Sequence, residues 1–402
     1  MKLPAITATT LALSASASAA AKSINYTTVQ GYFLQDDPST DPSTFDYTAQ
    51  NFGLLNRTYD ADLSIPGRGR NHPSSLSQWQ RFHRQLVYLN AHSPESVSYK
   101  LFFLGRHGEG WHNAAEDYYG TPAWNCYWSL LTGNSTATWF DADLTPAGIE
   151  QARIAHDYWI SRRETQQIHF PDAFYTSPMT RALKTANITF SDIPFLNNHP
   201  SHSHSHSNSS GFLPLVKEGF REGISLHTCD ARHTKSYIRD LFPTWPFEEG
   251  FTEEDELWTG VKGETSDAQD ERSRNALDDI FGPAFDKNSK NKNVHNGHNQ
   301  NTGASDLVIS VTAHSGEISS ILRVVGHQAF KLSTGAVIPV LIRAEEVVEE
   351  EEPTTTAPAW TVSAHCTTPP VTSTASGCVC ASSAAPVTTG LVVLATEAAS
   401  YY

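Results

Sequence analysis

Apolar runs and segments of helical spacing alternate through the middle of the chain. Residues 101–104, 172–177 and 306–313 are three short runs with the composition and length of buried strands. Residues 178–186 follow the second run and residues 317–328 the third, and both have the spacing of helices. This alternation predicts an α/β domain around a mostly parallel sheet, with helices on its faces.

Further elements flank this central pattern. Thr145 and Pro146 suit the start of a helix, because threonine caps a helix N-terminus and proline is accepted in the first turn. Apolar residues then recur with helical spacing at positions 149, 152, 155, 158 and 159. Residues 79–91 have a helical pattern as well, and residues 340–343 form the last expected strand.

Composition divides the chain into a leader, one domain and a tail. Residues 1–19 have the positive charge, apolar stretch and A-x-A cleavage motif of a secretory signal peptide. Residues 20–343 are predicted to form one domain, which includes an N-terminal extension ahead of the first strand. Residues 344–402 are rich in Glu, Thr, Ser, Pro and Ala, and are predicted to be a disordered tail in which Trp360 docks locally.

Two low-complexity insertions interrupt the predicted domain, near residues 197–210 and 287–303. The first contains a Ser-His repeat and the second is rich in Asn, Lys and His, so both are expected to be solvated surface loops. The Ser-His repeat could bind a transition metal, but a solvated loop is the favoured interpretation. No metal or cofactor is expected.

Five N-x-[S/T] sequons favour a secreted, glycosylated protein. They lie at Asn25, Asn56, Asn134, Asn187 and Asn208. The apolar part of the leader is weak, so a cytosolic location stays open as the alternative. The 5 cysteines cannot all pair within one chain, and their pairing is left open.

The formal net charge of −15 argues against a general binder of nucleic acid or of anionic membranes. No run of about 20 apolar residues follows the leader, so no membrane span is expected. The sequence leaves the oligomeric state open.

Charged and nucleophilic side chains stand at the ends of the three predicted strands. Arg106 and His107 follow the first run, Arg181 lies in the first turn of the next helix, and His314 ends the third run. Ligands of open α/β sheets bind outside the carboxyl ends of strands, so these residues are expected to share a pocket. A guanidinium can bind two phosphate oxygens, and a histidine kept neutral beside it can act as a nucleophile. The pattern indicates phosphoryl transfer through a phosphohistidine.

With these motifs the chain resembles the histidine phosphatase superfamily, and within it the phosphoglycerate mutase-like group. The resemblance spans roughly residues 99–343 and is carried by Arg106-His107-Gly108, by Ser177-Pro178 with Arg181 and Thr185, and by His314. A fungal branch of the group is most similar in detail, through Gly110, His112, Asn113, the segment 143–152, Arg221-Glu222 and Cys229-Asp230. The resemblance implies a three-layer α/β/α sandwich.

It also implies a role for each site residue. His107 attacks phosphorus and carries the phosphoryl group, and Glu222 protonates the leaving oxygen and then activates water. The phosphoryl oxygens are bound by Arg106, Arg181 and His314, and the same pocket is lined by Asn113. The residues alone do not separate Glu222 from two rival carboxylates, Glu109 and Glu218, because a raised carboxyl pKa cannot be seen in sequence. His112 is ambiguous, since it could simply shape the turn.

The favoured function is a phosphatase that hydrolyses small phosphorylated metabolites. Phosphoglycerate mutase-type transfer is disfavoured, because it needs extra basic residues and none lies between Arg106 and Arg153. A non-catalytic binding protein is disfavoured because the set of site residues is intact. Phytase activity is not expected either, since Gly110 and His112 stand where the acid phosphatase and phytase branch has Arg and Pro.

Overall fold

The computed structural model describes residues 22–63, 75–193, 212–286, 306–348, 359–370 and 379–380. The predicted signal peptide and both low-complexity insertions lie outside the described residues, as does the sequon at Asn208.

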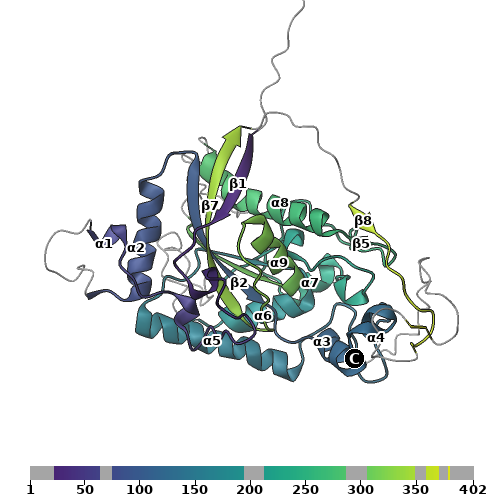
Figure 1. Ribbon diagram of the computed structural model, residues 1–402. Coiled ribbons are helices and arrows are strands. Elements are labelled where there is room, and N and C mark those ends of the chain that lie inside the picture. Colours follow the sequence, from purple (N-terminus) through teal and green to yellow (C-terminus); the bar gives the residue numbers. More distant parts are fainter. Residues whose placement is uncertain are drawn as a thin grey trace, which may run out of the picture.

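A six-stranded sheet forms the centre of the molecule, with the strand order β1-β7-β2-β6-β3-β4 (Figure 1). Its parallel block consists of β2 (Val97–Arg106), β6 (Val308–Ala313), β3 (Ala173–Thr176) and β4 (Leu215–Val216). At the other edge, β7 (Val337–Val348) runs antiparallel to both β2 and β1 (Lys22–Thr28). The predicted mostly parallel sheet is therefore confirmed.

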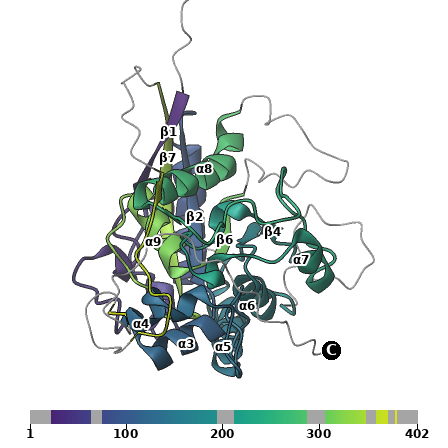
Figure 2. The ribbon, with the colours of Figure 1, turned by 90° about the vertical axis from the view of Figure 1, so that its right-hand side faces the viewer.

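Helices cover both faces of this sheet, because its central strands are apolar on both sides. In β2, Leu101 and Phe103 pack with α2 (Gln78–Ala91), α5 (Pro146–Gln166) and α6 (Thr180–Phe190). Phe102 and Leu104 point to the opposite face and pack with α8 (Ser266–Phe285) and α9 (Ser315–Val324). The two views of the ribbon show these layers (Figures 1 and 2). Thr145 caps α5 by accepting the N–H of Gly148 at 3.1 Å, as the sequence predicts.

Short elements complete the fold. The N-terminal extension contributes β1, which pairs with β7, and also Phe33 and Phe52, which are buried among the aromatic residues of α2. The remaining helices are α1 (Asp60–Leu63), α3 (Trp111–Tyr119), α4 (Thr121–Cys126) and α7 (Lys235–Leu241), with 3-10 turns at Leu34–Asp36, Asn51–Gly53, Trp128–Leu130, Glu218–Phe220 (η7) and Thr228–Asp230 (η8). In the part of the chain that the structure describes, no helix is both long and apolar enough to cross a membrane.

Part of the predicted disordered tail is packed against the domain. Strand β8 (Trp360–Thr361) pairs with β5 (Gly263–Glu264), and the Lys262 ammonium lies 4.4 Å from the centre of the Trp360 ring. Cys366 is buried and forms a disulfide with Cys380. Backbone hydrogen bonds and a disulfide hold these segments in place. Neither interaction requires a run of apolar residues, so the composition of the tail does not predict that these segments are ordered.

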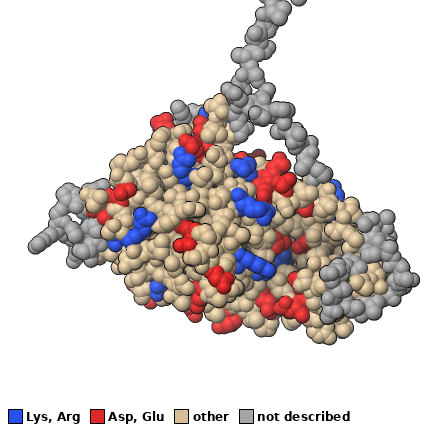
Figure 3. Space-filling view, viewed as in Figure 1, with Lys and Arg blue, Asp and Glu red and all other residues tan. Residues whose placement is uncertain are grey.

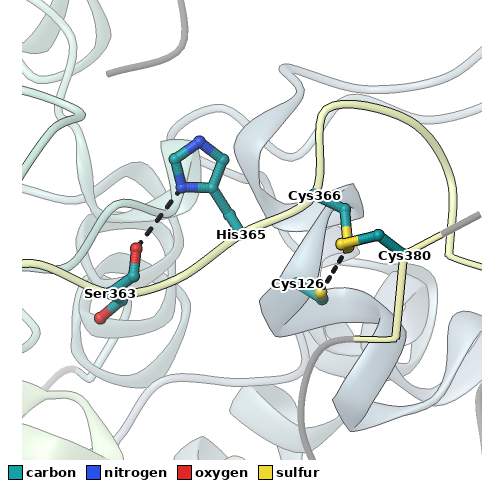
Figure 4. Close-up of a disulfide and its surroundings, with 5 residues drawn as sticks. All are labelled: Cys126, Ser363, His365, Cys366 and Cys380. Carbon is teal, nitrogen blue, oxygen red and sulfur yellow. Dashed lines mark hydrogen bonds between the residues drawn. A yellow bond between two sulfur atoms is a disulfide. The ribbon is translucent and has the colours of Figure 1, made fainter. Parts of the chain in front are cut away.

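The disulfide lies against helix α4. Cys366 donates its backbone N–H to the carbonyl of Cys126, at the end of α4, and the sulfur atoms of these two residues are 3.1 Å apart (Figure 4). The described tail segments therefore contact both α4 and β5, on which Glu264 lies.

Candidate active site

Two neighbouring parallel strands bring the first two site residues together. Strands β2 and β6 are in register at Arg106 and Ala313, and the N–H of His107 donates to the carbonyl of Ala313 at 3.0 Å. His107 and His314 therefore leave the same edge of the sheet side by side. The centres of their rings are 4.9 Å apart.

The third strand end adds Arg181. Strand β3 continues the sheet beyond β6, and the N–H of Ser177 donates to the carbonyl of Thr312 at 3.0 Å. Helix α6 then begins at Thr180, so Arg181 projects from the first helical turn. Met179 cannot cap this helix; instead, Asp141 accepts the N–H of Thr180 at 2.8 Å and its hydroxyl at 2.9 Å. Asp141 thus fixes the start of the helix that carries Arg181.

The loop after β2 lies unusually close to the start of α5. A Cβ atom on Gly108 would be 2.3 Å from the carbonyl oxygen of Gly148, and one on Gly148 would be 2.1 Å from that of Glu109. Both positions therefore require glycine, because the contacts are with backbone atoms that cannot move aside. The loop is also tied to α6, since Thr185 accepts the N–H of Gly108 at 3.0 Å.

His107 has the protonation state that a nucleophile needs. Its ring is almost fully buried, and Nδ1 lies 2.7 Å from the carbonyl oxygen of Gly108. A carbonyl only accepts, so Nδ1 carries the hydrogen and Nε2 keeps its lone pair. Burial, together with the charges of Arg181 and Arg106, holds the pKa of His107 well below its usual value. A neutral imidazole with an unprotonated Nε2 can attack phosphorus.

Two further buried histidines surround His107. His314 lies 2.7 Å from the hydroxyl of Ser177 through Nε2, and the ring of His112 is centred 5.4 Å from that of His107. Burial and the nearby Arg181 lower the pKa of both rings. A Cβ atom on Gly110 would be 2.7 Å from Nδ1 of His112, so His112 fills the space beside Gly110. The sequence left His112 ambiguous, and the structure places it against His107.

The two site arginines are held by backbone carbonyls and not by carboxylates. Arg106 donates to the carbonyl of Leu332 at 2.7 Å, and Arg181 to that of Cys229 at 2.8 Å. Among the described residues neither guanidinium forms an ion pair, and the Nε of each is buried without a partner. Buried cations in this state strongly favour an anion such as a phosphate group.

Glu222 reaches the site from a loop. Its carboxylate lies over the N-terminus of α9, where it accepts the N–H of Glu317 at 3.1 Å and that of Gly316 at 3.3 Å. A Cβ atom on Gly316 would be 2.2 Å from Glu222 Oε1, so this approach requires glycine. Helix α9 begins directly after His314, which places Glu222 near the histidine pair. Burial raises the pKa of Glu222 and Asp230 adds to this effect, while Arg181 and the N–H groups oppose it.

The rival carboxylates have other partners. The carboxylate of Glu109 accepts the hydroxyl of Thr145 at 2.6 Å and so belongs to the start of α5. Glu218 forms ion pairs with Arg232 and, at 3.3 Å, with Arg221. Of the three candidates, Glu222 is the one that contacts the helix following His314.

Asn113 lies at the start of α3, next to His112. Its side-chain oxygen accepts the N–H of Gly110 at 3.0 Å, and the residue is half-buried. This contact fixes the loop that follows His107. Its predicted contact with substrate stays a prediction.

Sequence reasoning missed the residues that hold the site in place. Asp141 lies just before the segment 143–152 that carries part of the resemblance, but a capping contact across 39 positions gives no local signal. Arg272 on α8 binds the backbone around Glu222, and its helix carries no motif. His112 lies in the motif that follows His107, but the sequence alone did not assign a role to it.

Known proteins that are similar to this chain over most of its length have phosphoglycerate mutase-like names. The scan against family models found no match. The chain is 43% identical over 329 residues to a protein of Arthroderma benhamiae named "Probable phosphoglycerate mutase", covering 82% of this chain and 87% of that protein. It is 35% identical to "Phosphomutase-like protein 3" of Candida albicans, covering 80% of each. A phosphoglycerate mutase structure from Thermus thermophilus matches 60% of this chain and 97% of its own at 18% identity, with a TM-score of 0.29.

The solved structure is too distant to carry weight, but the two fungal relatives are similar over most of their length. Their names agree with the group that the motifs around His107, Arg181 and His314 indicate. The chain belongs to the phosphoglycerate mutase-like group of the histidine phosphatase superfamily.

Proposed function

We propose that this protein hydrolyses small phosphomonoesters through a phosphohistidine on His107. The observation that carries the proposal is the setting of His107: a buried ring whose Nδ1 lies 2.7 Å from the Gly108 carbonyl oxygen, so that Nε2 is left to attack. Burial and the two neighbouring arginines lower the pKa of the ring, which favours its neutral form. Arg106 and Arg181 lie beside it; the Nε of each is buried, and neither guanidinium has a carboxylate partner among the described residues. The two arginines can bind a dianionic phosphate group, and the uncharged His107 ring can then attack it.

In the proposed first step, Nε2 of His107 attacks phosphorus and the bond from phosphorus to the leaving oxygen breaks. The electron pair of that bond stays on the leaving oxygen, which takes a proton from the Glu222 carboxyl group. The positive charge that develops on the His107 ring is offset by the negative charge of the phosphoryl oxygens. Arg106, Arg181 and His314 bind those oxygens and stabilise their charge in the transition state.

In the second step, the Glu222 carboxylate removes a proton from water, and the resulting hydroxide attacks phosphorus. The nitrogen–phosphorus bond breaks, its electron pair returns to Nε2, and inorganic phosphate leaves. Glu222 regains its proton, so both side chains return to their starting state. The raised pKa of Glu222 supports this double role, because the group must give up and accept a proton near neutral pH.

Hydrolysis is favoured over phosphoglycerate mutase-type transfer by the arginines next to Glu222. Arg221 is bound to Asp255 at 2.8 Å and Arg232 to Glu218, and the side chains of both are fully buried. They are therefore occupied and not placed to bind a second phosphate group. The name of the Arthroderma protein keeps mutase activity as the second candidate.

The substrate is proposed to be small, since attraction depends on local arginines. The net charge is −15, and acidic and basic residues are interspersed over the face in Figure 3. A phosphorylated metabolite needs only the two site arginines, whereas a nucleic acid would need a broad basic surface.

The test measures phosphate release from a panel of phosphomonoesters beside interconversion of 2- and 3-phosphoglycerate. We expect phosphate release, which His107→Ala should lower by about 10⁴-fold or more. His92→Ala, an exposed histidine at the end of α2, should be unchanged and serves as the control. Interconversion without phosphate release would favour the mutase. Binding of phosphorylated ligands without turnover would favour a non-catalytic binding protein.

A secreted, glycosylated state is proposed alongside this activity. Asn25, Asn56 and Asn134 are exposed, so their sequons are accessible to a glycan, whereas Asn187 is half-buried in α6. Mass spectrometry of protein recovered from culture medium should find residues 1–19 removed and glycans on exposed sequons. Protein found only inside cells, with an intact leader and no glycan, would contradict the location and leave the chemistry untouched.

A further inference from the structure

We propose that Arg272 of α8, acting with Glu317 of α9, is a positioning residue that holds Glu222 in place for proton transfer. The inference rests on the proposed function, in which Glu222 is the general acid. Arg272 is not near a strand end, carries no motif and touches no reacting atom. Its place in the reaction follows from what its guanidinium binds.

The Arg272 guanidinium binds the backbone of the turn that carries Glu222. Nη1 donates to the carbonyl of Gly219 at 2.9 Å and to that of Arg221 at 3.0 Å. Nη2 donates to the carbonyl of Glu222 itself at 3.3 Å. Three carbonyls within four residues therefore converge on one planar group, and this turn contains no regular sheet or α-helix of its own.

The same guanidinium also binds two carboxylates. Nη1 lies 3.0 Å from Oε2 of Glu317, and Nη2 lies 2.8 Å from Oε2 of Glu264 in β5. Glu317 is fully buried and also accepts the hydroxyl of Ser273 at 2.8 Å. The backbone N–H of the same Glu317 binds the Glu222 carboxylate. Arg272 is thus connected to Glu222 at both its backbone and, through Glu317, its carboxylate.

The Glu222 carboxylate is closely packed, so its position depends on the position of the turn that carries it. Glu222 Oε1 lies 2.2 Å from the position that a Cβ atom on Gly316 would have, so the carboxylate and the start of α9 are in direct contact. A displacement of this turn would move the carboxylate relative to His314, which precedes the same helix. A misplacement of about 1 Å in a reacting group can lower the rate about 10²-fold.

Charged groups on five elements face Glu222 and set its proton affinity. They are Arg106 at the end of β2, Arg181 in α6, Asp230 in η8, Arg272 in α8 and Glu317 in α9. Burial raises the pKa of Glu317 to about 7, with Arg272 opposing and Glu222 adding to the rise. Glu317 and Glu222 therefore influence one another as well as sharing the same helix N-terminus.

A purely structural role is the competing explanation, and the chain offers a matched control for it. Arg323 of α9 forms an ion pair with Asp270 of α8, 2.6 Å long and more exposed. It joins the same two helices as Arg272, but its guanidinium donates to Asp270 and not to the Glu222 turn. If Arg272 only joins α8 to α9, then its replacement should behave like Arg323→Gln.

The test compares kcat/KM for two substrates in the full-length protein. Glycerol 2-phosphate has a poor alkoxide leaving group that needs a proton, and 2,4-dinitrophenyl phosphate has a leaving group that needs almost none. Arg272→Lys keeps the charge but cannot bridge the carbonyls with a planar fork. It should lower kcat/KM for glycerol 2-phosphate about 10- to 100-fold, by misplacing the acid. The value for the aryl phosphate should stay within about threefold, and Arg323→Gln should leave both unchanged.

Glu317→Gln is the second variant, because it keeps the size and the Ser273 contact if Arg272→Lys does not fold. Glu317→Gln should also lower the ratio of kcat/KM for the alkyl phosphate to kcat/KM for the aryl phosphate. Because it removes a negative charge next to Glu222, Glu222 should lose its proton at a lower pH, and the alkaline decline in activity should shift to a lower pH. Equal losses on both substrates, or no loss, would overturn the positioning role. Glu222→Gln separates the two proposals. If Glu222→Gln loses as much kcat/KM on the aryl phosphate as on the alkyl phosphate, then the proposed function fails. If Glu222→Gln loses more on the alkyl phosphate but the Arg272 and Glu317 variants do not, then only the role of Arg272 fails.

Discussion

The two sides of the candidate site are built by different means. His107, His314 and Arg181 follow three adjacent strands, and backbone hydrogen bonds of the sheet fix the first two at one edge. Glu222 lies on a segment with two-residue strands at most. It is held by the Arg272 side chain of α8 and by backbone N–H groups at the start of α9. The strand side therefore depends on regular backbone pairing, whereas the loop side depends on a few buried polar contacts that single substitutions can remove.

The largest effect on the loop side is expected from Glu222→Gln. It should lower kcat/KM for alkyl phosphates by about 10²- to 10⁴-fold, the range typical of general acid catalysis. The wild-type rate should also fall as pH rises through the raised pKa of Glu222, because the group must be protonated to act. The variant should lack that decline. A pH profile of kcat/KM measures both, with the exposed Glu256→Gln as the control. An unchanged rate would return Glu218 and Glu109 to consideration.

Buried Glu317 should make the loop side sensitive to alkaline pH. Burial raises its pKa from 4.5 to about 7, so its favourable contribution to stability is complete below the unfolded pKa and is lost as pH rises through about 7. Up to about 3 kcal/mol of unfolding free energy is at stake between these values. Denaturant unfolding of the wild type and of Glu317→Gln from pH 4 to 8 checks this, and we expect a flatter pH dependence in the variant. Parallel curves would contradict the effect.

A smaller effect is expected on the strand side, where Asp141 holds the start of α6. Asp141→Ala removes the acceptor of the Thr180 N–H and hydroxyl, and should lower the unfolding free energy by about 1–2 kcal/mol. kcat should fall and KM should rise, since Arg181, which is proposed to stabilise the transition state, projects from the first turn of that helix. Thermal unfolding and steady-state kinetics test both statements. Unchanged kinetics beside a loss of stability would mean that Asp141 does not position Arg181.

The smallest effect is expected from Glu109→Gln, close to His107 in the sequence. Its side chain accepts a hydroxyl of the α5 cap, which an amide oxygen can also do. The unfolding free energy should change by no more than about 0.5 kcal/mol, and kcat/KM by no more than about twofold. A loss as large as that of Glu222→Gln would identify Glu109 as the acid.

The same contrast explains what the sequence could predict. Strand and helix periodicity, with His107, Arg181 and His314 at strand ends, predicts the sheet and this side of the site, because parallel strands bring their ends to one edge. Glu222 came from the resemblance, since its position depends on Gly316 lying 94 residues away. The contacts of Asp141 and Arg272 join distant segments through single side chains, and no periodic pattern predicts such contacts.

The most direct test of the central claim is to trap the covalent intermediate. The wild type and Glu222→Gln should be quenched rapidly during turnover of an aryl phosphate, digested at alkaline pH and analysed by mass spectrometry. We expect an acid-labile phosphoryl group on His107, which accumulates in Glu222→Gln because water is no longer activated, and which is absent from His107→Ala. Phosphorylation of another residue, or a His107→Ala variant that retains full phosphate release, would contradict the account.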